Sequence, residues 1–444
     1  MKDGIGLFVG LVYSLNIVVG GGFLNLPYVF KQTGLLLSLS FMVFFSALSF
    51  YLSMIFLEVI HKGCIMKTRL KKIDQPFLYT APKVDDISIV FQSIFGYKFS
   101  IIYLTALTVY FEGSLVAYSS IFAASFTSNI PLYFLSTCDI YEKGFYSSCI
   151  INYWIFLGLF GFIVIYLSLL GIKNQKTFQV SMCGLRYFII CLIIYCSIEL
   201  IYTGKTIDGK PGSKPEPQLA DFSKAHLAVP IIVFSLMYQL LLPSIAAIVH
   251  KRSQKMWKIV LMVTFIIFII YSALGIIVPY AISNVKEQVS LNFRDYTGGQ
   301  NEKNLWGYFV MYGVILQPAF DVIACFPFKT ISLADNWGHM IYGDKIKSEK
   351  IIKVLVFVFG VVPLMFAAVF YNIAEVFGIV GLLPLVLFHA VVPIAHNIVN
   401  EQVKDKTSFD AGFYWRPLNY AITAGALTLF LYLLRQKING ILGF

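Results

Sequence analysis

The chain reads Asn16-Ile-Val-Val-Gly20-Gly21-Gly22-Phe-Leu-Asn25-Leu-Pro27 in the middle of its first apolar segment. Each of the three glycines costs about 1 kcal/mol relative to alanine inside a helix, and Pro27 removes a backbone hydrogen-bond donor. Unwound backbone at membrane depth is tolerated only where it is buried in protein or lines a cavity. We therefore expect a broken membrane helix, with free N–H groups for a carboxylate and free carbonyl groups for an ammonium or a cation. A zwitterion is the ligand that uses both ends.

The composition of the chain indicates that most of it lies in a membrane. Of its 444 residues, 58% are hydrophobic and 13% are charged, whereas about a quarter of the residues in soluble domains are charged. The aromatic share of 16% fits rings placed at the membrane interface. The formal net charge of +11 comes from short loops between apolar segments, where topology explains it, so we expect no nucleic-acid partner.

Eleven segments are apolar over the roughly 20 residues that a helix needs to cross a bilayer. They are 5–30, 34–60, 99–127, 151–170, 179–202, 226–249, 258–283, 306–333, 352–371, 376–399 and 416–435. We therefore predict an all-α membrane protein in which residues 1–444 form a single transmembrane domain. No cleavable signal is evident, so the first segment is expected to serve as its own membrane signal.

Basic residues predict the orientation of the chain. With the N-terminus in the cytoplasm, the inner segments carry 21 lysines and arginines and the outer segments carry 11. This bias favours a cytoplasmic N-terminus and, with eleven spans, a C-terminus outside or in a lumen. The membrane itself, plasma membrane or endolysosomal or vacuolar membrane, stays open. The longest inner segment, 61–98, is expected to be a loop with at most a short surface helix.

Two outer loops carry further information. Cys138 and Cys149 both fall in the outer loop 128–150, where a disulfide suits an extracellular or luminal face, although two unpaired thiols are the alternative. The outer linker 203–225 is rich in Gly, Pro and polar residues, which predicts a flexible connector. This linker separates five predicted spans from six.

The sixth predicted span repeats the interruption of the first. It reads Val229-Pro-Ile-Ile-Val-Phe234-Ser235-Leu-Met-Tyr238-Gln239-Leu-Leu-Leu-Pro243, with two prolines and a polar centre. Interrupted segments at matching places in two five-span halves indicate an inverted-repeat transporter. We therefore predict a first repeat at 5–202, a second repeat at 226–399 and one peripheral helix at 416–435. Close helix packing on small residues is the alternative explanation of the glycines.

The motif Asn16-x-x-x-Gly20-x-Gly22-x-Leu24-x-Leu26-Pro27, followed by Phe30 and Gly34, resembles the first helix of the amino acid/auxin permease family. That family belongs to the amino acid–polyamine–organocation superfamily, and the resemblance implies the leucine-transporter-type fold of two inverted five-helix repeats. The stretch from Phe326-Pro327 to Asp335-Asn336 resembles a second group of sequences. This group is a little-characterised branch of transmembrane proteins near the sodium-coupled neutral amino acid transporters.

The resemblance implies a substrate site between the breaks of the first and sixth spans. Its residues would be Val19, Gly20, Gly21 and Gly22, faced by Phe234, Ser235 and Tyr238. In sodium-coupled relatives a cation lies between the first break and hydroxyl-bearing residues on span eight. This sequence departs from that pattern, because 320–325 contains neither Ser nor Thr. Protons and sodium therefore both stay open as coupling ions, and no other cofactor or metal is expected.

Ionisable residues inside spans need a reason, since each costs roughly 2.5–3.5 kcal/mol on insertion scales. Asn16 of the motif, Glu112 in span three and Asp321 in span eight are the candidates for ion coupling. The alternative for each carboxyl is a structural, hydrogen-bonded role. Arg186 lies near the predicted inner end of span five, so we expect it to extend to the interface in a structural role.

These observations predict a secondary transporter for amino acids or similar small zwitterions, working by alternating access. The alternative is a transporter-like sensor that binds an amino acid without appreciable flux. An enzyme is not expected, since the sequence has no H-E-x-x-H, G-x-S-x-G or Walker motif and no Cys/His cluster with metal-ligand spacing. The expected partners are an amino acid and the lipid bilayer, and the oligomeric state stays open.

Overall fold

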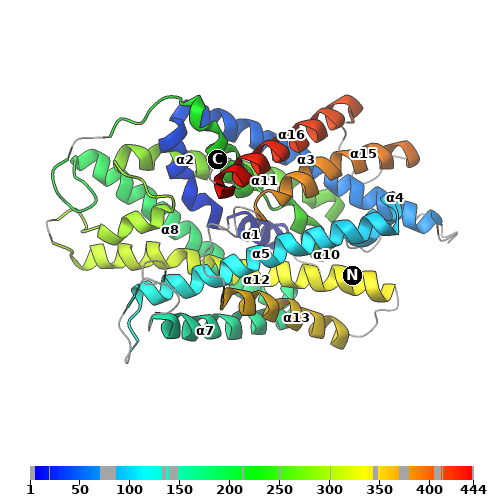
Figure 1. The fold of residues 1–444 in the computed structure, drawn as a ribbon, viewed down its shortest axis with the longest axis horizontal. Helices are drawn as coiled ribbons and strands as arrows, with labels where there is room; N and C mark the ends of the chain where they lie inside the picture. The colour runs from blue at the N-terminus through cyan, green and yellow to red at the C-terminus, as the bar shows by residue number, and fades with distance from the viewer. Residues whose placement is uncertain are drawn as a thin grey trace.

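The computed structural model describes residues 6–19, 21–70, 87–132, 137–138, 140, 149–212, 215–249, 252–300, 302–343, 349–369, 380–404, 412 and 414–442. Within these ranges the regular structure is helical, and the β-structure consists of isolated bridge residues, of which Lys205 and Pro211 pair with each other. Most helices run along the long axis of the molecule (Figure 1). The chain is therefore an α-helical bundle, as its composition predicts.

Among the described residues, nine helical segments are long and apolar enough to cross a membrane. Eight contain one long helix each: α3 (Leu35–Leu70), α5 (Tyr97–Asn129), α7 (Cys149–Leu170), α8 (Lys176–Thr203), α11 (Arg252–Ala281), α12 (Leu305–Tyr342), α13 (Glu349–Ala367) and α16 (Arg416–Leu442). The ninth, Phe222–Ala246, is interrupted, and a bent pair at the N-terminus raises the number to ten. Multiple membrane passes are thus present, whereas the total of eleven stays a prediction.

The predicted tenth span lies only partly within the described residues. From Val380 onward the chain contains the π-helical turn η7 (Leu385–Ala390) and the helix α15 (Val391–Gln402). Residues 376–379, where this span was predicted to begin, lie outside the described residues.

Both predicted breaks are present. At the first, α1 (Leu7–Val18) ends, the 3-10 turn η1 (Gly21–Asn25) follows, and α2 (Leu26–Thr33) continues with Pro27 in its first turn. The two halves are bent by 51°. At the second, α9 (Ala225–Ser235) ends before the turn η4 (Gln239–Leu241), and α10 (Leu242–Ile248) begins with Pro243 in its first turn. Proline fits there because the first turn of a helix leaves its N–H groups unpaired in any case.

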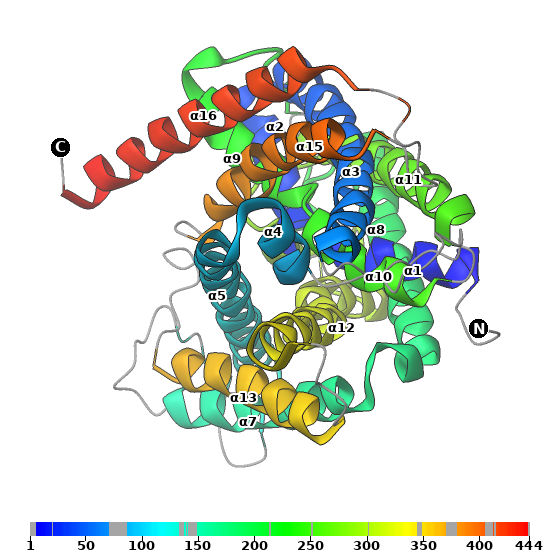
Figure 2. The same ribbon diagram turned by 90° about the vertical axis from the view of Figure 1, so that its right-hand side faces the viewer.

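The inner segment 61–98 differs from its prediction as a loop. Helix α3 continues to Leu70, and 87–95 forms the helix α4 (Ile87–Phe95), whose first five residues are buried. The Ser88 N–H donates to Asn336 Oδ1 on α12 at 3.1 Å. Seen along the long axis of the molecule, α4 lies among α3, α5 and α12 (Figure 2). A buried helix therefore covers this end, because the apolar run Ile87–Phe91 finds a place between the long helices rather than on the membrane surface.

The outer linker is not the free connector that its Gly/Pro content predicts, at least over 203–212 and 215–225. Its backbone pairs with the corner between α2 and α3: Leu35 N–H donates to Gln218 O at 3.0 Å, and Asp221 N–H donates to Thr33 O at 2.7 Å. Gly34 occupies this corner with φ of 90°, and a Cβ there would lie 2.6 Å from the backbone of Ala220. Backbone pairing and close packing outweigh the flexibility of the linker sequence.

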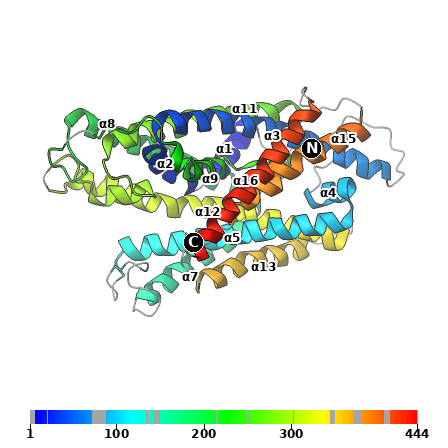
Figure 3. The same cartoon turned by 45° about the horizontal axis from the view of Figure 1, so that its top comes forward.

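Two features at the edges of the bundle agree with the sequence analysis. Cys138 and Cys149 form a disulfide with Cα atoms 5.8 Å apart. Helix α16 crosses the other helices obliquely at the edge of the molecule (Figure 3). It packs on α15 and η7, where Thr423 Oγ1 donates to Ala390 O at 3.1 Å.

Candidate functional site

The two breaks lie against each other at the centre of the molecule. A Cβ placed on Gly22, in η1, would lie 2.9 Å from Ser235 Oγ and 3.1 Å from Phe234 Cδ1 at the end of α9. Real Cβ atoms essentially never come within 3.0 Å of another heavy atom, so the Ser235 side chain would have to shift to admit a side chain at Gly22. The Ser235 Cα would also lie only 3.3 Å from that Cβ, which gives this glycine a packing role beyond its low helix propensity.

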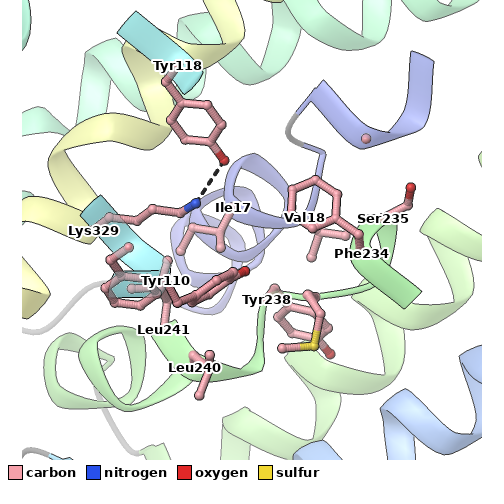
Figure 4. Close-up of a pocket in the computed structure, with 13 residues that line it drawn as sticks. Ile17, Val18, Tyr110, Tyr118, Phe234, Ser235, Tyr238, Leu240, Leu241 and Lys329 are labelled. Atoms are coloured by element: carbon pink, nitrogen blue, oxygen red, sulfur yellow. Dashed lines mark hydrogen bonds between the residues drawn. The ribbon is translucent and has the colours of Figure 1, made fainter. Parts of the chain in front are cut away.

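A small cavity lies beside this contact (Figure 4). It is lined by Ile17, Val18, Gly22, Tyr110, Phe111, Tyr118, Phe234, Ser235, Met237, Tyr238, Leu240, Leu241 and Lys329. Its volume of ≈ 30 Å³ is enough for about two water molecules, so it is smaller than an amino acid.

Four of the seven predicted substrate residues line this one cavity: Gly22, Phe234, Ser235 and Tyr238. Val19 is completely buried next to it but is not a lining residue. Gly21 begins η1, and Gly20 lies outside the described residues. The prediction that span one and span six meet thus agrees with the geometry, whereas the binding roles of these residues stay predictions.

A buried ion pair lies directly below the first break. Arg186 Nε on α8 is 2.5 Å from Asp321 Oδ1 on α12, and both side chains are almost completely inaccessible. Arg186 Nη1 also donates to the backbone oxygen of Asn16 and to its Oδ1, each at 3.0 Å. The Asn16 amide in turn donates to Gln179 O at 2.8 Å and to Gln179 Oε1 at 2.7 Å. These contacts connect α1, α8 and α12 through one polar network.

The prediction that Arg186 extends to the membrane interface is therefore wrong. The buried residues of α8 recur at Gln179, Cys183, Arg186 and Ile190, which is one face of a helix, and this face packs on α1 and α12. The side chain points into the bundle, where Asp321 and the carbonyl at the end of α1 offer it partners. Asn16 and Asp321, predicted independently as ion-coupling residues, are joined by this arginine.

The guanidinium provides a cation between the end of α1 and α12. The family resemblance places the sodium of coupled relatives in this region, between the first break and span eight. Here the positive charge belongs to the protein, and its contacts are the Asn16 carbonyl, the Asp321 carboxylate and the Cys325 sulfur at 3.9 Å.

Glu112, the third ion-coupling candidate, is separate from this network. It lies on α5, and neither carboxyl oxygen has a hydrogen-bond partner among the described residues although both are buried. Nothing in the described structure joins it to Asn16 or Asp321, and its role in ion coupling stays a prediction.

Nine of the thirteen lining residues were not selected by the sequence analysis, and Lys329 is the basic residue among them. It comes from α12, is 6% exposed, and its Nζ donates to Ser114 Oγ at 2.7 Å and to Tyr118 Oη at 3.0 Å on α5. A lysine eight residues after Asp321 is on nearly the same face of one helix. This spacing was the sequence signal that could have placed Lys329 in the interior, since Asp321 was already assigned there.

Comparison with known proteins identifies the class of this protein. The chain belongs to the family of transmembrane amino acid transporter proteins, whose family model matches residues 3–434. The resemblance drawn from the first-span motif is thereby confirmed, and the family consists of transporters rather than enzymes.

Individual relatives carry one common name. The chain is 21% identical over 389 residues to Transmembrane protein 104 of Gallus gallus, which covers 76% of this chain and 75% of that protein. It is 20% identical over 437 residues to Transmembrane protein 104 of Homo sapiens, with 84% and 83% covered. A Transmembrane protein 104 homolog of Caenorhabditis briggsae is 22% identical over 345 residues, with 74% and 68% covered.

Proposed function

We propose that this protein is a secondary active transporter that moves amino acids or similar small zwitterions across a membrane. The observation that carries the proposal is the contact of two broken helices, one from each half of the chain, beside a cavity with polar groups. Membership of an amino acid transporter family supports the same substrate class.

The break geometry suits a zwitterion. The N–H groups at the start of the outer half-helix would hold the carboxylate, and the carbonyl groups at the end of α1 would hold the ammonium. Ser235 and Tyr238 supply hydroxyl groups on the opposite wall. Since the cavity is smaller than an amino acid, we propose that its walls move apart on binding, by alternating access between a repeat at 5–202 and a repeat at 226–399.

The proposed coupling ion is a proton rather than sodium. The Arg186 guanidinium already supplies a positive charge between α1 and α12, so a sodium ion there would meet a like charge. Asp321 is committed to the ion pair with Arg186. Glu112 is the buried carboxyl without a partner among the described residues, and we assign proton transfer to it.

Uptake into proteoliposomes tests this proposal. The purified protein is reconstituted and supplied with a panel of labelled amino acids, with sodium or choline outside, at acidic and at neutral pH. We expect uptake that survives the replacement of sodium and increases when the outside is acidic, and we expect Glu112→Gln to remove the pH dependence. Binding without flux for every amino acid would instead favour the sensor, and loss of uptake in choline would contradict the proton assignment.

A further inference from the structure

Lys329 is a buried cation at the wall of the cavity. Its Nζ uses two hydrogen bonds, to Ser114 Oγ and Tyr118 Oη. The ammonium also lies 4.4 Å from the Tyr118 ring centroid, 5.6 Å from that of Tyr110 and 5.9 Å from that of Phe111. Aromatic faces attract cations, but neither they nor two neutral hydroxyls neutralise the charge.

No carboxylate oxygen of the described residues lies within 4.0 Å of this ammonium. The interior acid on the same helix, Asp321, is paired with Arg186. The oxygens of Glu112 have no hydrogen-bond partner in the described structure, so they do not contact Lys329 either. An ammonium inside a membrane protein is costly, and such groups generally pair with an opposite charge or mark a substrate pathway.

The position of Lys329 separates it from the part of the cavity that would hold a zwitterion. Lys329 and Tyr118 lie on one side of the cavity, and Phe234 and Ser235 lie on the other, with Ile17 and Val18 between them (Figure 4). The backbone break at Gly22 belongs to the second side. A ligand that bridges the cavity would therefore meet the break with one end and the ammonium with the other.

We propose that the substrate carries a second carboxylate, which binds Lys329, so that the protein selects amino acids with acidic side chains. This inference rests on the proposed transport function and adds the substrate class. The α-carboxylate and α-ammonium would occupy the helix break, and the side-chain carboxylate would take the third hydrogen of the Lys329 ammonium beside Tyr118. A neutral amide of the same shape would leave the ammonium without an opposite charge.

The isosteric pairs glutamate/glutamine and aspartate/asparagine test this inference, since they differ in charge but hardly in size. In the wild-type protein we expect the acid to be taken up with at least about tenfold higher efficiency than its amide. Lys329→Met should abolish that preference, and Lys329→Arg should retain much of it. Lys258→Met, which removes an exposed lysine of α11, is the matched control and should leave the preference unchanged.

If Lys329→Met does not transport any amino acid, a binding measurement still tests the preference for an acidic side chain. Glutamate should raise the thermal unfolding temperature of the detergent-purified wild type more than glutamine at equal concentration. Equal uptake of acid and amide by the wild type, or an acid preference that persists in Lys329→Met, would overturn the inference while leaving amino acid transport intact. Failure of every amino acid to be transported would instead contradict the proposed function.

Discussion

Gly22 is the residue where the two broken spans touch, and it offers the most direct test of the site. In Gly22→Leu the new side chain would collide with Ser235 and Phe234, because even a Cβ would lie 2.9 Å from Ser235 Oγ. We expect uptake to be abolished while the amount of protein in the membrane stays close to that of the wild type. Labelled amino acid uptake, normalised to protein amount, measures the effect.

The matched control for this change is Gly184→Leu. Gly184 is an exposed helical glycine of α8, and a Cβ there would meet nothing within 4 Å. Uptake by this variant should equal that of the wild type. Normal uptake by Gly22→Leu would show that the substrate binds elsewhere.

The Arg186–Asp321 pair predicts a strong effect on stability. Asp321→Asn leaves the guanidinium buried without an opposite charge, and breaking a buried ion pair costs about 3–5 kcal/mol. We expect a clear decrease in the unfolding temperature of the purified protein. The same change at the exposed Asp295 should have little effect.

A double variant separates stability from transport. Arg186→Met combined with Asp321→Leu removes both charges, and apolar replacements of a buried pair are often tolerated. This protein should recover most of the lost stability but not the uptake, since the contact with Asn16 is lost as well. An unfolding temperature unchanged by Asp321→Asn alone would contradict the assignment of a buried pair.

For single residues, the sequence predicted which residues lie near the breaks better than it predicted the direction in which a side chain points. The glycine and proline pattern predicted the two breaks, and the family resemblance placed Gly22, Phe234, Ser235 and Tyr238 between them, where they line one cavity. Arg186 was misplaced, since the distance of a residue from a span end does not reveal which neighbouring helix its face meets. The partner that turns this arginine inward lies 135 positions away in the chain.

The short helix α4 covers the end of the bundle that the sequence predicts to face the cytoplasm. It is held on α12 through Ser88 and Asn336, with Ser88 N–H donating to Asn336 Oδ1 at 3.1 Å and Ser88 Oγ donating to Asn336 O at 3.2 Å. Ser100 Oγ on α5 donates to Ser88 O at 2.6 Å. We predict that a route from the cavity to this end of the bundle passes among these helices, so that α4 shifts when the route opens.

Cross-linking tests whether α4 moves. In Ser88→Cys/Asn336→Cys an oxidant should join α4 to α12 and stop uptake, and a reductant should restore it. Each single cysteine variant, treated identically, is the control and should stay active. Full uptake by the cross-linked protein would show that α4 stays in place during the transport cycle.

Helices and helix breaks were predicted correctly where the local sequence alone determines them. The breaks of spans one and six follow from backbone chemistry, and both are present. Segment 61–98 was assigned to a loop, although Ile87–Phe91 is a buried apolar run. A short apolar run does not by itself reveal which helices will cover it. Here α3, α5 and α12 pack around this run.

For the molecule as a whole, the described structure contains nine candidate spans in a helical bundle, and the family is that of amino acid transporters. The inverted repeat, the eleventh span and the orientation remain predictions, because apolar length alone does not specify which helices correspond or which side faces the cytoplasm.

The disulfide allows the orientation to be measured. In Cys149→Ser, Cys138 becomes a free, partly accessible thiol. In sealed vesicles we expect a membrane-impermeant maleimide to label it only from the side opposite to an N-terminal tag, whose position is read by protease cleavage. The unaltered protein, with its disulfide intact, serves as the unlabelled control. Labelling and tag cleavage from the same side would reverse the predicted topology of this loop.

The backbone pairing between the outer linker and the α2–α3 corner has a mechanical consequence. The linker leads directly into α9. Lys224 Nζ, at the end of the linker, donates to Gln32 Oε1 on α2 at 2.9 Å. The outer halves of both interrupted spans are thus fastened to each other at their far ends. We therefore expect an exit that opens toward that side to move α2 and α9 together, as a single hinged panel, rather than to part them.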